Sequence, residues 1–414
     1  MREFIKINGN KKLEGEVTVS SCKNSAVAIL PAVVLASEIV KLYDVPEIQD
    51  VKVLVKLLNL LNIDVVAKDD ELTIDPTNII NTDLLDEDVM KLRASYYFMG
   101  ALLGRFKYVK MYSPGGCNLG PRPIDLHLKG FEALGATINQ EDNIIEISAD
   151  NLIGNDIYLD FASVGATINI MLAACFAQGR TTIENAAKEP EIIDLSSMLN
   201  KMGAKIRGAG TSEITIDGVS RLKGCIHDII PDRIEAGTYI IAAAACGKDV
   251  TIKNVIPQHI EALISKLEEM NVKLVQGYDY IRVLESNDLK AVDIITQPFP
   301  GFATDLQQPL TALLTKASGD SHVEETIYME RFKHCGELNL MGAEIDYTTG
   351  NSFIHGPSEL HGAEISATDL RCGACLVIAG LMAKGETIIH NAYHIYRGYD
   401  SIVDKLKALG ADID

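Results

Sequence analysis

The chain has 414 residues, a formal net charge of −19 and 47 % hydrophobic residues. Because one hydrophobic core rarely serves so long a chain, we expect two domains of roughly 200 residues each. The negative charge argues against a nucleic-acid surface and against an anionic membrane surface as partners. The N-terminal segment lacks the apolar region of a secretory signal, and no apolar run approaches the roughly 18 residues of a membrane span. We therefore expect a cytoplasmic globular protein.

The eight cysteines are scattered along the chain, at positions 22, 117, 175, 225, 246, 335, 372 and 375. In a chain without a secretory signal, this spread favours reduced thiols over a disulfide framework. Cys372 and Cys375 have the spacing of a metal-binding pair, but no second pair follows. They begin an apolar, helix-like run (Cys372–Ala383), so we interpret them as buried core residues and expect neither a metal nor a cofactor.

A unit of about 70 residues recurs six times. Each copy ends in a helix-like segment, a Gly or Asn, and a short β-like run. Gly or Asn is expected there because it takes the left-handed conformation that closes a helix. The six endings are Leu61-Asn62-Ile63, Leu134-Gly135-Ala136, Met202-Gly203-Ala204, Met270-Asn271-Val272, Met341-Gly342-Ala343 and Leu409-Gly410-Ala411.

Between these endings lies a second marker, an Ala-rich apolar helix followed by a glycine and a β-rich run. The glycines are Gly104, Gly179, Gly247, Gly319 and Gly385. A helix that is apolar on every face must be buried on every side. Three such helices in each half predict an α/β protein of two similar domains, each with its apolar helices inside a coat of sheet and amphipathic helices.

A strand at Phe4–Ile7 precedes the first copy of the unit and could pair with the C-terminal half of the chain. The second domain would then be assembled from both chain ends. We accordingly predict one domain at residues 22–230 and another at residues 1–21 plus 231–414.

In chain order, the first candidate site residues stand at helix starts. Lys23 and Asn24 come directly before an apolar segment (Ser25–Ala36), where a basic residue has no packing role. Arg93 stands at another helix start. The small residues of ASVGAT (162–167) open a further apolar helix, so free backbone N–H groups and the helix dipole are offered to an anion there.

The stretch 113–127, SPGGCNLGPRPIDLH, places Cys117 after two glycines and Arg122 between two prolines. Glycine and proline at this density exclude a helix or a central strand, so the stretch is a loop. An exposed loop thiol is usually either reactive or avoided. Cys117 is therefore a candidate reactive group, and an incidental surface cysteine is the alternative.

The second half of the chain offers a carboxylate and three arginines. Asp305 follows Thr304 at a helix start, where an ordinary N-cap is an equal alternative to a functional carboxylate. Arg331, Arg371 and Arg397 recur at equivalent places in the repeats, although any one of them could be a surface residue. Together they favour a cationic cleft suited to substrates rich in phosphate and carboxylate.

Five motifs resemble the UDP-N-acetylglucosamine enolpyruvyl transferases (1-carboxyvinyltransferases), within the enolpyruvyl transferase family. They are GGCNLGPRPIDLH (115–127), Cys22-Lys23-Asn24, ASVGAT (162–167), ATDLQ (303–307) and YRGYD (396–400). The motifs run along the entire chain in the family's order, as does the six-fold repeat. The cysteine loop is specific to this enzyme, whereas the related 5-enolpyruvylshikimate-3-phosphate synthases share only the repeat.

The resemblance implies a fold of two inside-out α/β barrel domains, of the enolpyruvyl transferase/RNA 3′-phosphate cyclase type. It implies transfer of the enolpyruvyl group of phosphoenolpyruvate to the 3-hydroxyl of UDP-N-acetylglucosamine, with release of phosphate. That reaction is the first committed step of peptidoglycan synthesis, so it serves cell-wall formation, cell shape and cell division. The family needs no cofactor and is inhibited by fosfomycin. Downstream cell-wall enzymes are conceivable partners.

The resemblance also implies roles for individual residues. Cys117 is the general acid that protonates the enol methylene carbon, Asp305 is the base for the sugar hydroxyl, and Lys23 and Arg397 complete the catalytic set. The residues implied for phosphoenolpyruvate are Lys23, Asn24, Arg122, Arg331, Arg371 and Arg397. Those implied for UDP-N-acetylglucosamine are Asn24, Arg93, Arg122, Pro123, Ile124, Asp125, Leu126, Ser163, Val164, Gly165, Asp305 and Ile327.

Three features depart from the family's pattern. Ser21 and Cys22 replace the usual Gly-Ala before Lys23, Ala162 replaces a common proline, and Ala303 replaces another. None of these changes removes a reacting group, so we expect an active enzyme with shifted affinities.

Two alternatives remain at this stage. One is another enzyme of the same architecture, a shikimate-pathway synthase or an RNA 3′-phosphate cyclase, although the negative charge disfavours the cyclase. The other is a regulatory paralogue that binds the nucleotide sugar without turnover. The presence of Cys117, Asp305, Lys23 and Arg397 argues against that paralogue.

Overall fold

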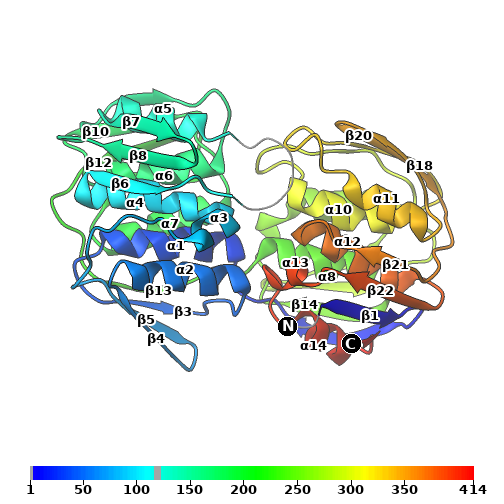
Figure 1. The fold of residues 1–414 in the computed structure, drawn as a ribbon. Helices are drawn as coiled ribbons and strands as arrows, with labels where there is room; N and C mark the ends of the chain where they lie inside the picture. The colour runs from blue at the N-terminus through cyan, green and yellow to red at the C-terminus, as the bar shows by residue number, and fades with distance from the viewer. Residues whose placement is uncertain (1–2, 116–122) are drawn as a thin grey trace. The chain divides into compact units, whose positions relative to one another are not determined.

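Figure 1 shows the computed structural model, which describes residues 3–115 and 123–414. Its chain divides into two compact units. Among the described residues, the first unit comprises 3–20 and 231–414, and the second unit comprises 21–115 and 123–230. Two residues of the predicted site, Cys117 and Arg122, lie outside the described residues.

The second unit contains apolar helices that are buried along most of their length, α1 (Lys23–Ala32), α4 (Tyr97–Phe106) and α6 (Val164–Ala174). Its other helical segments are α2 (Gln49–Leu60), α3 (Glu87–Lys91), α5 (Asp125–Ala133), α7 (Pro190–Lys201), and the 3-10 turns η1 (Val33–Leu35) and η2 (Arg93–Tyr96). Its sheets have the strand orders β13-β3-β5-β4, β6-β8-β7 and β11-β12-β10-β9. The strands are β3 (Val40–Tyr43), β4 (Asp64–Lys68), β5 (Glu71–Asp75), β6 (Tyr108–Tyr112), β7 (Thr137–Glu141), β8 (Ile144–Ser148), β9 (Asp156–Tyr158), β10 (Arg180–Glu184), β11 (Lys205–Arg207), β12 (Glu213–Asp217) and β13 (Ile226–Asp228).

The first unit repeats this plan with the buried helices α8 (Arg233–Cys246), α10 (Thr304–Leu314) and α12 (Leu370–Met382). Its other helical segments are η3 (Pro257–His259), α9 (Glu261–Glu269), α11 (Lys333–Leu340), α13 (Tyr393–Tyr396) and α14 (Ile402–Ala408). Its sheets have the strand orders β21-β22-β1-β23, β15-β16-β14-β2 and β17-β18-β20-β19. The strands are β1 (Phe4–Asn8), β2 (Leu13–Thr18), β14 (Gly247–Lys253), β15 (Lys273–Gln276), β16 (Tyr280–Leu284), β17 (Ile294–Ile295), β18 (Gly319–Glu324), β19 (Glu344–Thr348), β20 (Asn351–Gly356), β21 (Glu364–Ser366), β22 (Glu386–His390) and β23 (Asp412–Ile413).

Apolar helices connect parallel neighbours within the sheets. Strands β9 and β10 precede and follow α6, β17 and β18 do the same for α10, and β21 and β22 for α12. Parallel strands need such a crossover, which is usually a helix. Strand β1 lies between β22 and β23 with antiparallel pairing, so both chain ends share one sheet of the first unit.

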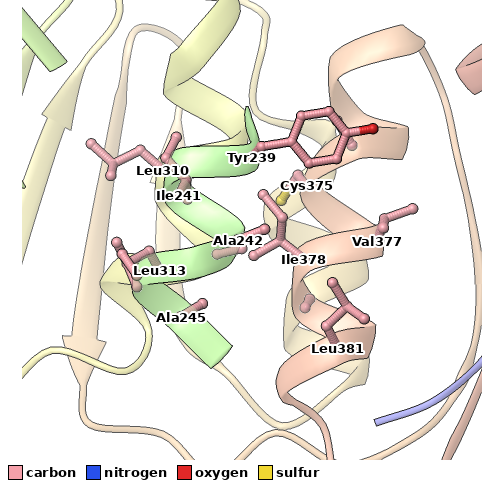
Figure 2. Close-up of a cluster of buried hydrophobic side chains, with 14 of the residues drawn as sticks. Tyr239, Ile241, Ala242, Ala245, Leu310, Leu313, Cys375, Val377, Ile378 and Leu381 are labelled. Carbon is pink, nitrogen blue, oxygen red and sulfur yellow. The ribbon is translucent and has the colours of Figure 1, made fainter. Parts of the chain in front are cut away.

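The core of the first unit is built where α8, α10 and α12 pack together (Figure 2). Tyr239 and Ala242 of α8, Leu310 of α10 and Ile378 of α12 are among the buried side chains. Burying one large aliphatic side chain of this kind is worth roughly 1.5–3 kcal/mol. Because water is excluded along these helices, polar side chains can reach solvent only near the helix ends.

The predicted closures of the six repeats are confirmed. Residues with positive φ follow the amphipathic helices α2, α5, α7, α9, α11 and α14. They are Asn62 (φ 59°), Gly135 (94°), Gly203 (107°), Asn271 (70°), Gly342 (96°) and Gly410 (94°). The left-handed conformation is therefore the physical reason for Gly or Asn at these positions.

The second marker is wrong at one of its five positions. Gly104 lies inside α4, and the left-handed residue that closes this helix is Lys107 (φ 57°). A Cβ on Gly104 would lie 3.0 Å from the carbonyl oxygen of Leu172, so this glycine serves close helix packing. Gly247 directly follows α8 and begins β14, as the marker predicts.

Cys372 and Cys375 are buried in α12, as predicted, and burial raises the pKa of the Cys372 thiol to about 12. The seven cysteines of the described ranges are all free thiols. Within residues 3–115 and 123–414, no cluster of three or more His, Cys, Asp or Glu side chains is arranged to hold a metal ion. None of the helices described in those ranges is long and apolar enough to cross a membrane.

We predict that Ile378→Ala lowers the free energy of unfolding by about 2–5 kcal/mol, because it removes a fully packed side chain and leaves a cavity between helices. Urea unfolding followed by circular dichroism measures the loss. The matched control is Leu340→Ala, whose side chain is 60 % exposed and whose loss should change stability by no more than about 0.5 kcal/mol. Equal effects of the two substitutions would contradict the proposed core.

Candidate active site

One carboxylate in the first unit is shared by two arginines. Arg331 Nη1 donates to Asp305 Oδ1 over 2.8 Å, and Arg371 donates to Asp305 Oδ2 from Nη2 over 2.9 Å and from Nε over 3.2 Å. The arginine side chains are each 3 % exposed and that of Asp305 is 26 % exposed. We call this group the Asp305 clamp. It brings together three residues that the sequence predicted for one site.

The helix starts explain where the clamp forms. Asp305 is the second residue of α10 and Arg371 the second residue of α12, so both backbones stand at the positive ends of helix dipoles, which favour a nearby anion. The N-cap of α10 is Ala303, and no side chain caps this helix end. The interpretation of Asp305 as an ordinary N-cap is therefore wrong.

The clamp fixes the protonation state of its carboxylate. Burial by itself raises the pKa of the Asp305 carboxyl, but the charges of Arg371 and Arg331 and their hydrogen bonds bring that pKa well below its ordinary value. Asp305 is therefore ionised at neutral pH, as a base must be. While both arginines hold it, however, its affinity for a proton is low.

A buried carboxylate, Glu325, is linked to the clamp through Thr304. Thr304 Oγ1 donates to Glu325 Oε2 over 2.8 Å and accepts a hydrogen bond from Arg331 Nη1 over 3.0 Å. Glu325 Oε1 accepts from Thr296 Oγ1 and from the backbone N–H of Ile327, both over 2.8 Å. Ile327, a predicted sugar contact, is thereby held in the same network. Glu325 itself was missed by the sequence analysis.

The YRGYD segment lies at the same end of α12. The guanidinium of Arg371 is 5.4 Å from the centroid of the Tyr399 ring, and the Tyr399 hydroxyl is 2.8 Å from Thr238 Oγ1 of α8. Arg397 is half-buried and follows α13 directly. Burial, together with the charge of Arg397, lowers the pKa of His394. The end of the first unit that carries Asp305 thus also carries cationic charge from this segment.

In the second unit, Lys23 and Asn24 are the first two residues of α1. Lys23 Nζ lies 3.1 Å from Asp50 Oδ2, and Asn24 Nδ2 donates to Glu191 Oε1 over 3.4 Å. Both side chains are therefore oriented by carboxylates of neighbouring helices. The side chain of the preceding Cys22 is buried in the core of this unit.

Arg93 contacts the beginning of the cysteine loop (residues 113–127). Its Nη1 donates to the carbonyl oxygen of Pro114 over 3.2 Å, and its guanidinium lies 5.5 Å from the centroid of the Tyr96 ring. A cation over an aromatic face is held there electrostatically. Arg93 is thus hydrogen-bonded to the described beginning of this loop.

The first turn of α6 carries Ser163, Val164 and Gly165. Ser163 is its N-cap, and the Ser163 hydroxyl accepts a hydrogen bond from the Ala166 N–H over 3.3 Å. A Cβ on Gly165 would lie 2.9 Å from the Tyr96 hydroxyl, so a larger residue would force that side chain to move. The Ala166 N–H is thus already capped within the turn, and an anion site at this helix start stays a prediction.

The remaining predicted residues begin α5. Pro123 and Asp125 are exposed, whereas Ile124 and Leu126 are half-buried. Ile124 is the N-cap residue and Asp125 the first helical residue. The structure thus brings Asp305, Arg331 and Arg371 into contact in the first unit. A meeting of that group with Lys23, Asn24 or Cys117 stays a prediction.

The comparisons with known proteins agree on one family. The model of the EPSP synthase (3-phosphoshikimate 1-carboxyvinyltransferase) family matches residues 7–406. The UDP-N-acetylglucosamine 1-carboxyvinyltransferase 2 of Staphylococcus aureus (strain MRSA252) is 55 % identical over 413 residues, which cover 100 % of this chain and 98 % of that relative. Its namesake in Geobacillus kaustophilus (strain HTA426) is 55 % identical over 409 residues, 99 % of this chain and 96 % of the relative.

Solved structures give the same result for the fold. The enolpyruvyl transferase NikO from Streptomyces tendae superposes with a TM-score of 0.91 at 25 % identity, covering 99 % of this chain and 98 % of that one. The EPSP synthase of Acinetobacter baumannii has a TM-score of 0.78 at 18 % identity, over 100 % of this chain and 99 % of its own. The predicted fold class of two similar α/β domains is confirmed. By its sequence and its fold, the chain belongs to the enolpyruvyl (1-carboxyvinyl) transferase family.

Proposed function

We propose that this chain transfers the enolpyruvyl group of phosphoenolpyruvate to the 3-hydroxyl of UDP-N-acetylglucosamine and releases phosphate. The observation that carries the proposal is the Asp305 clamp, an ionised carboxylate in contact with two buried guanidiniums. The names of relatives that are 55 % identical support this pair of substrates. If the chain catalyses this reaction, we expect it to act in peptidoglycan synthesis and to be located in the cytoplasm.

The clamp suggests how the base becomes available. Arginine binds carboxylate and phosphate through several N–H groups at once, so Arg331 and Arg371 suit the two anionic groups of phosphoenolpyruvate. A substrate that takes their hydrogen bonds withdraws charge stabilisation from Asp305 and raises its proton affinity. Asp305 then accepts the proton of the sugar hydroxyl as that oxygen attacks the enol carbon.

The proton for the methylene carbon is assigned to Cys117 on the strength of the family resemblance. An unperturbed thiol titrates near ~8.5 and is mostly protonated at neutral pH, as a general acid requires. Lys23, Arg122 and Arg397 are proposed to stabilise the tetrahedral intermediate, because preorganised positive charge is most effective where negative charge gathers. As phosphate leaves, the new methyl group returns a proton to the Cys117 thiolate, which restores the carbon–carbon double bond and completes the transfer.

The first test is the substrate pair. With phosphoenolpyruvate and UDP-N-acetylglucosamine, the purified protein should release phosphate and form the enolpyruvyl nucleotide sugar, as measured by a coupled phosphate assay and mass spectrometry. Shikimate 3-phosphate in place of the nucleotide sugar should give no product. Turnover of shikimate 3-phosphate alone would overturn the proposal, and failure of both pairs would favour a regulatory binding protein.

Asp305→Asn should lower kcat by about 10²- to 10⁴-fold, the usual contribution of a general base, while UDP-N-acetylglucosamine still binds in calorimetry. The control is Asp249→Asn, which breaks a comparable carboxylate–arginine contact with Arg282 (2.7 Å) that lies exposed on the sheet. That control should keep kcat. Unchanged kcat in Asp305→Asn, with only a lower melting temperature, would leave Asp305 a purely structural role.

Cys117→Ser should lower kcat by about 10²-fold or more, because the hydroxyl is a far weaker acid than the thiol. Binding of the nucleotide sugar should persist. After fosfomycin treatment, mass spectrometry should find one adduct on Cys117 in the unmodified sequence and none in Cys117→Ser. Cys225→Ser, which changes a half-buried thiol of the second unit, is the control. Full activity of Cys117→Ser would contradict the acid role.

A further inference from the structure

Two adjacent glutamines of α10 are buried but differ in their partners. Gln307 is 1 % exposed, and neither atom of its amide has a hydrogen-bond partner in the part of the chain that the structure describes. Gln308 is fully buried, and both atoms of its amide have partners. Of these two buried amides, that of Gln308 is therefore the one that can hold its neighbours in place, and Gln307 serves as its comparison.

The side-chain amide of Gln308 connects Arg331 with Asp369. Its Oε1 accepts from Arg331 Nε over 3.2 Å, and its Nε2 faces Asp369 Oδ2 and His334 Nδ1, both at 3.4 Å. Burial lowers the pKa of His334 to about 3, so this ring is neutral, and its Nδ1 can accept. Arg331 offers only donors and the other two offer acceptors, which fixes the orientation of the amide.

These hydrogen bonds form a closed ring of residues that includes the three residues of the Asp305 clamp. Asp369, the N-cap of α12, accepts from the backbone N–H of Arg371 over 2.9 Å. The ring therefore runs from Asp305 through Arg331, Gln308 and Asp369 to Arg371 and back to Asp305. Within it, Arg331 is held at two separate points, with Nε on Gln308 and Nη1 on Asp305. A planar guanidinium fixed at two points cannot turn about its long axis.

We propose that Gln308 is a positioning residue, which sets the orientation of the Arg331 guanidinium at Asp305 and thereby tunes both phosphoenolpyruvate binding and the base. This inference rests on the proposed function. The task suits glutamine because one group must accept on one side and donate on the other. Glutamate would set a second carboxylate against Asp369, and an aliphatic side chain would offer nothing to either neighbour.

Removing the Gln308 amide should raise the pKa of Asp305. Without its acceptor, Arg331 Nε–H loses its hydrogen bond, and the guanidinium stays bonded through Nη1 to Asp305 and Thr304 but can turn about that point and away from Asp305. The charge that lowers the pKa of Asp305 is then weaker, so that pKa rises. Because the base must be ionised to act, the acidic limb of the kcat/KM profile moves to higher pH. A residue that only stabilised the fold would leave this limb in place.

The experiment compares Gln308→Met with Gln307→Met, a matched pair of near-isosteric changes at adjacent, equally buried positions. Gln308→Met should raise KM for phosphoenolpyruvate about ten-fold, leave KM for the nucleotide sugar within about two-fold, and shift the acidic limb upward. Gln307→Met should match the unsubstituted protein in all three. If Gln308→Met does not fold, Gln308→Asn and Gln307→Asn replace the pair, because the shortened amide no longer reaches Arg331.

A second readout needs no turnover. In ¹⁵N-arginine spectra, the Nε–H signal of Arg331, assigned by its loss in Arg331→Lys, should exchange slowly with solvent in the unsubstituted protein and in the Gln307 variant. It should exchange fast in the Gln308 variant. Slow exchange in both variants, or equal kinetics in both, would overturn the inference. If the unsubstituted protein has no activity, the proposed function fails while the exchange contrast still decides the role of Gln308.

Discussion

The candidate site of the first unit, at the N-terminal ends of α10 and α12, depends on one carboxylate that is shared by two buried guanidiniums. Asp305 lies between Arg331 and Arg371, and neither arginine has more than a trace of exposed surface. Removing one partner of such a buried pair usually costs 3–5 kcal/mol, because the remaining charge is left uncompensated. Loss of Asp305 or of either arginine is therefore expected to destabilise the remaining residues of the Asp305 clamp. In the reaction that we propose, a substrate that brings its own negative charge replaces Asp305 as the partner of an arginine, and binding is thereby coupled to release of the base.

The arrangement follows from the burial of the apolar helices. Helices α8, α10 and α12 offer water no accessible side, so the polar residues of their sequences gather at the ends. At the N-terminal ends, unpaired backbone N–H groups and the helix dipole favour anions. The same logic holds in the second unit, where Lys23 and Ser163 stand at the starts of α1 and α6. A repeat whose apolar helices are buried thus also has charged residues at its helix ends.

The sequence predicted the repeat well because its signals are local. A Gly or Asn that closes a helix is read from its neighbours, and Asn62 and Gly410 behave as expected. Gly104 was misread because its reason is a contact with Leu172, far along the chain. Glu325 and Gln308 gave no signal, since the side chains that link them to the site, Thr304 and Asp369, lie 21 and 61 positions away. Pairing at that distance is decided by the fold. Cys117 lies outside the described residues, so its role still rests on the resemblance.

The central claim is that two arginines keep Asp305 ionised. The most direct measurement is a carbon-13 titration of the aspartate side-chain carboxyls by NMR, with the Asp305 signal identified by its absence in Asp305→Asn. The account predicts that this signal keeps the chemical shift of an ionised carboxylate down to about pH 4, because its pKa lies well below the ordinary ~3.9 of aspartate. A carboxyl that titrates at or above ~3.9 would contradict the account.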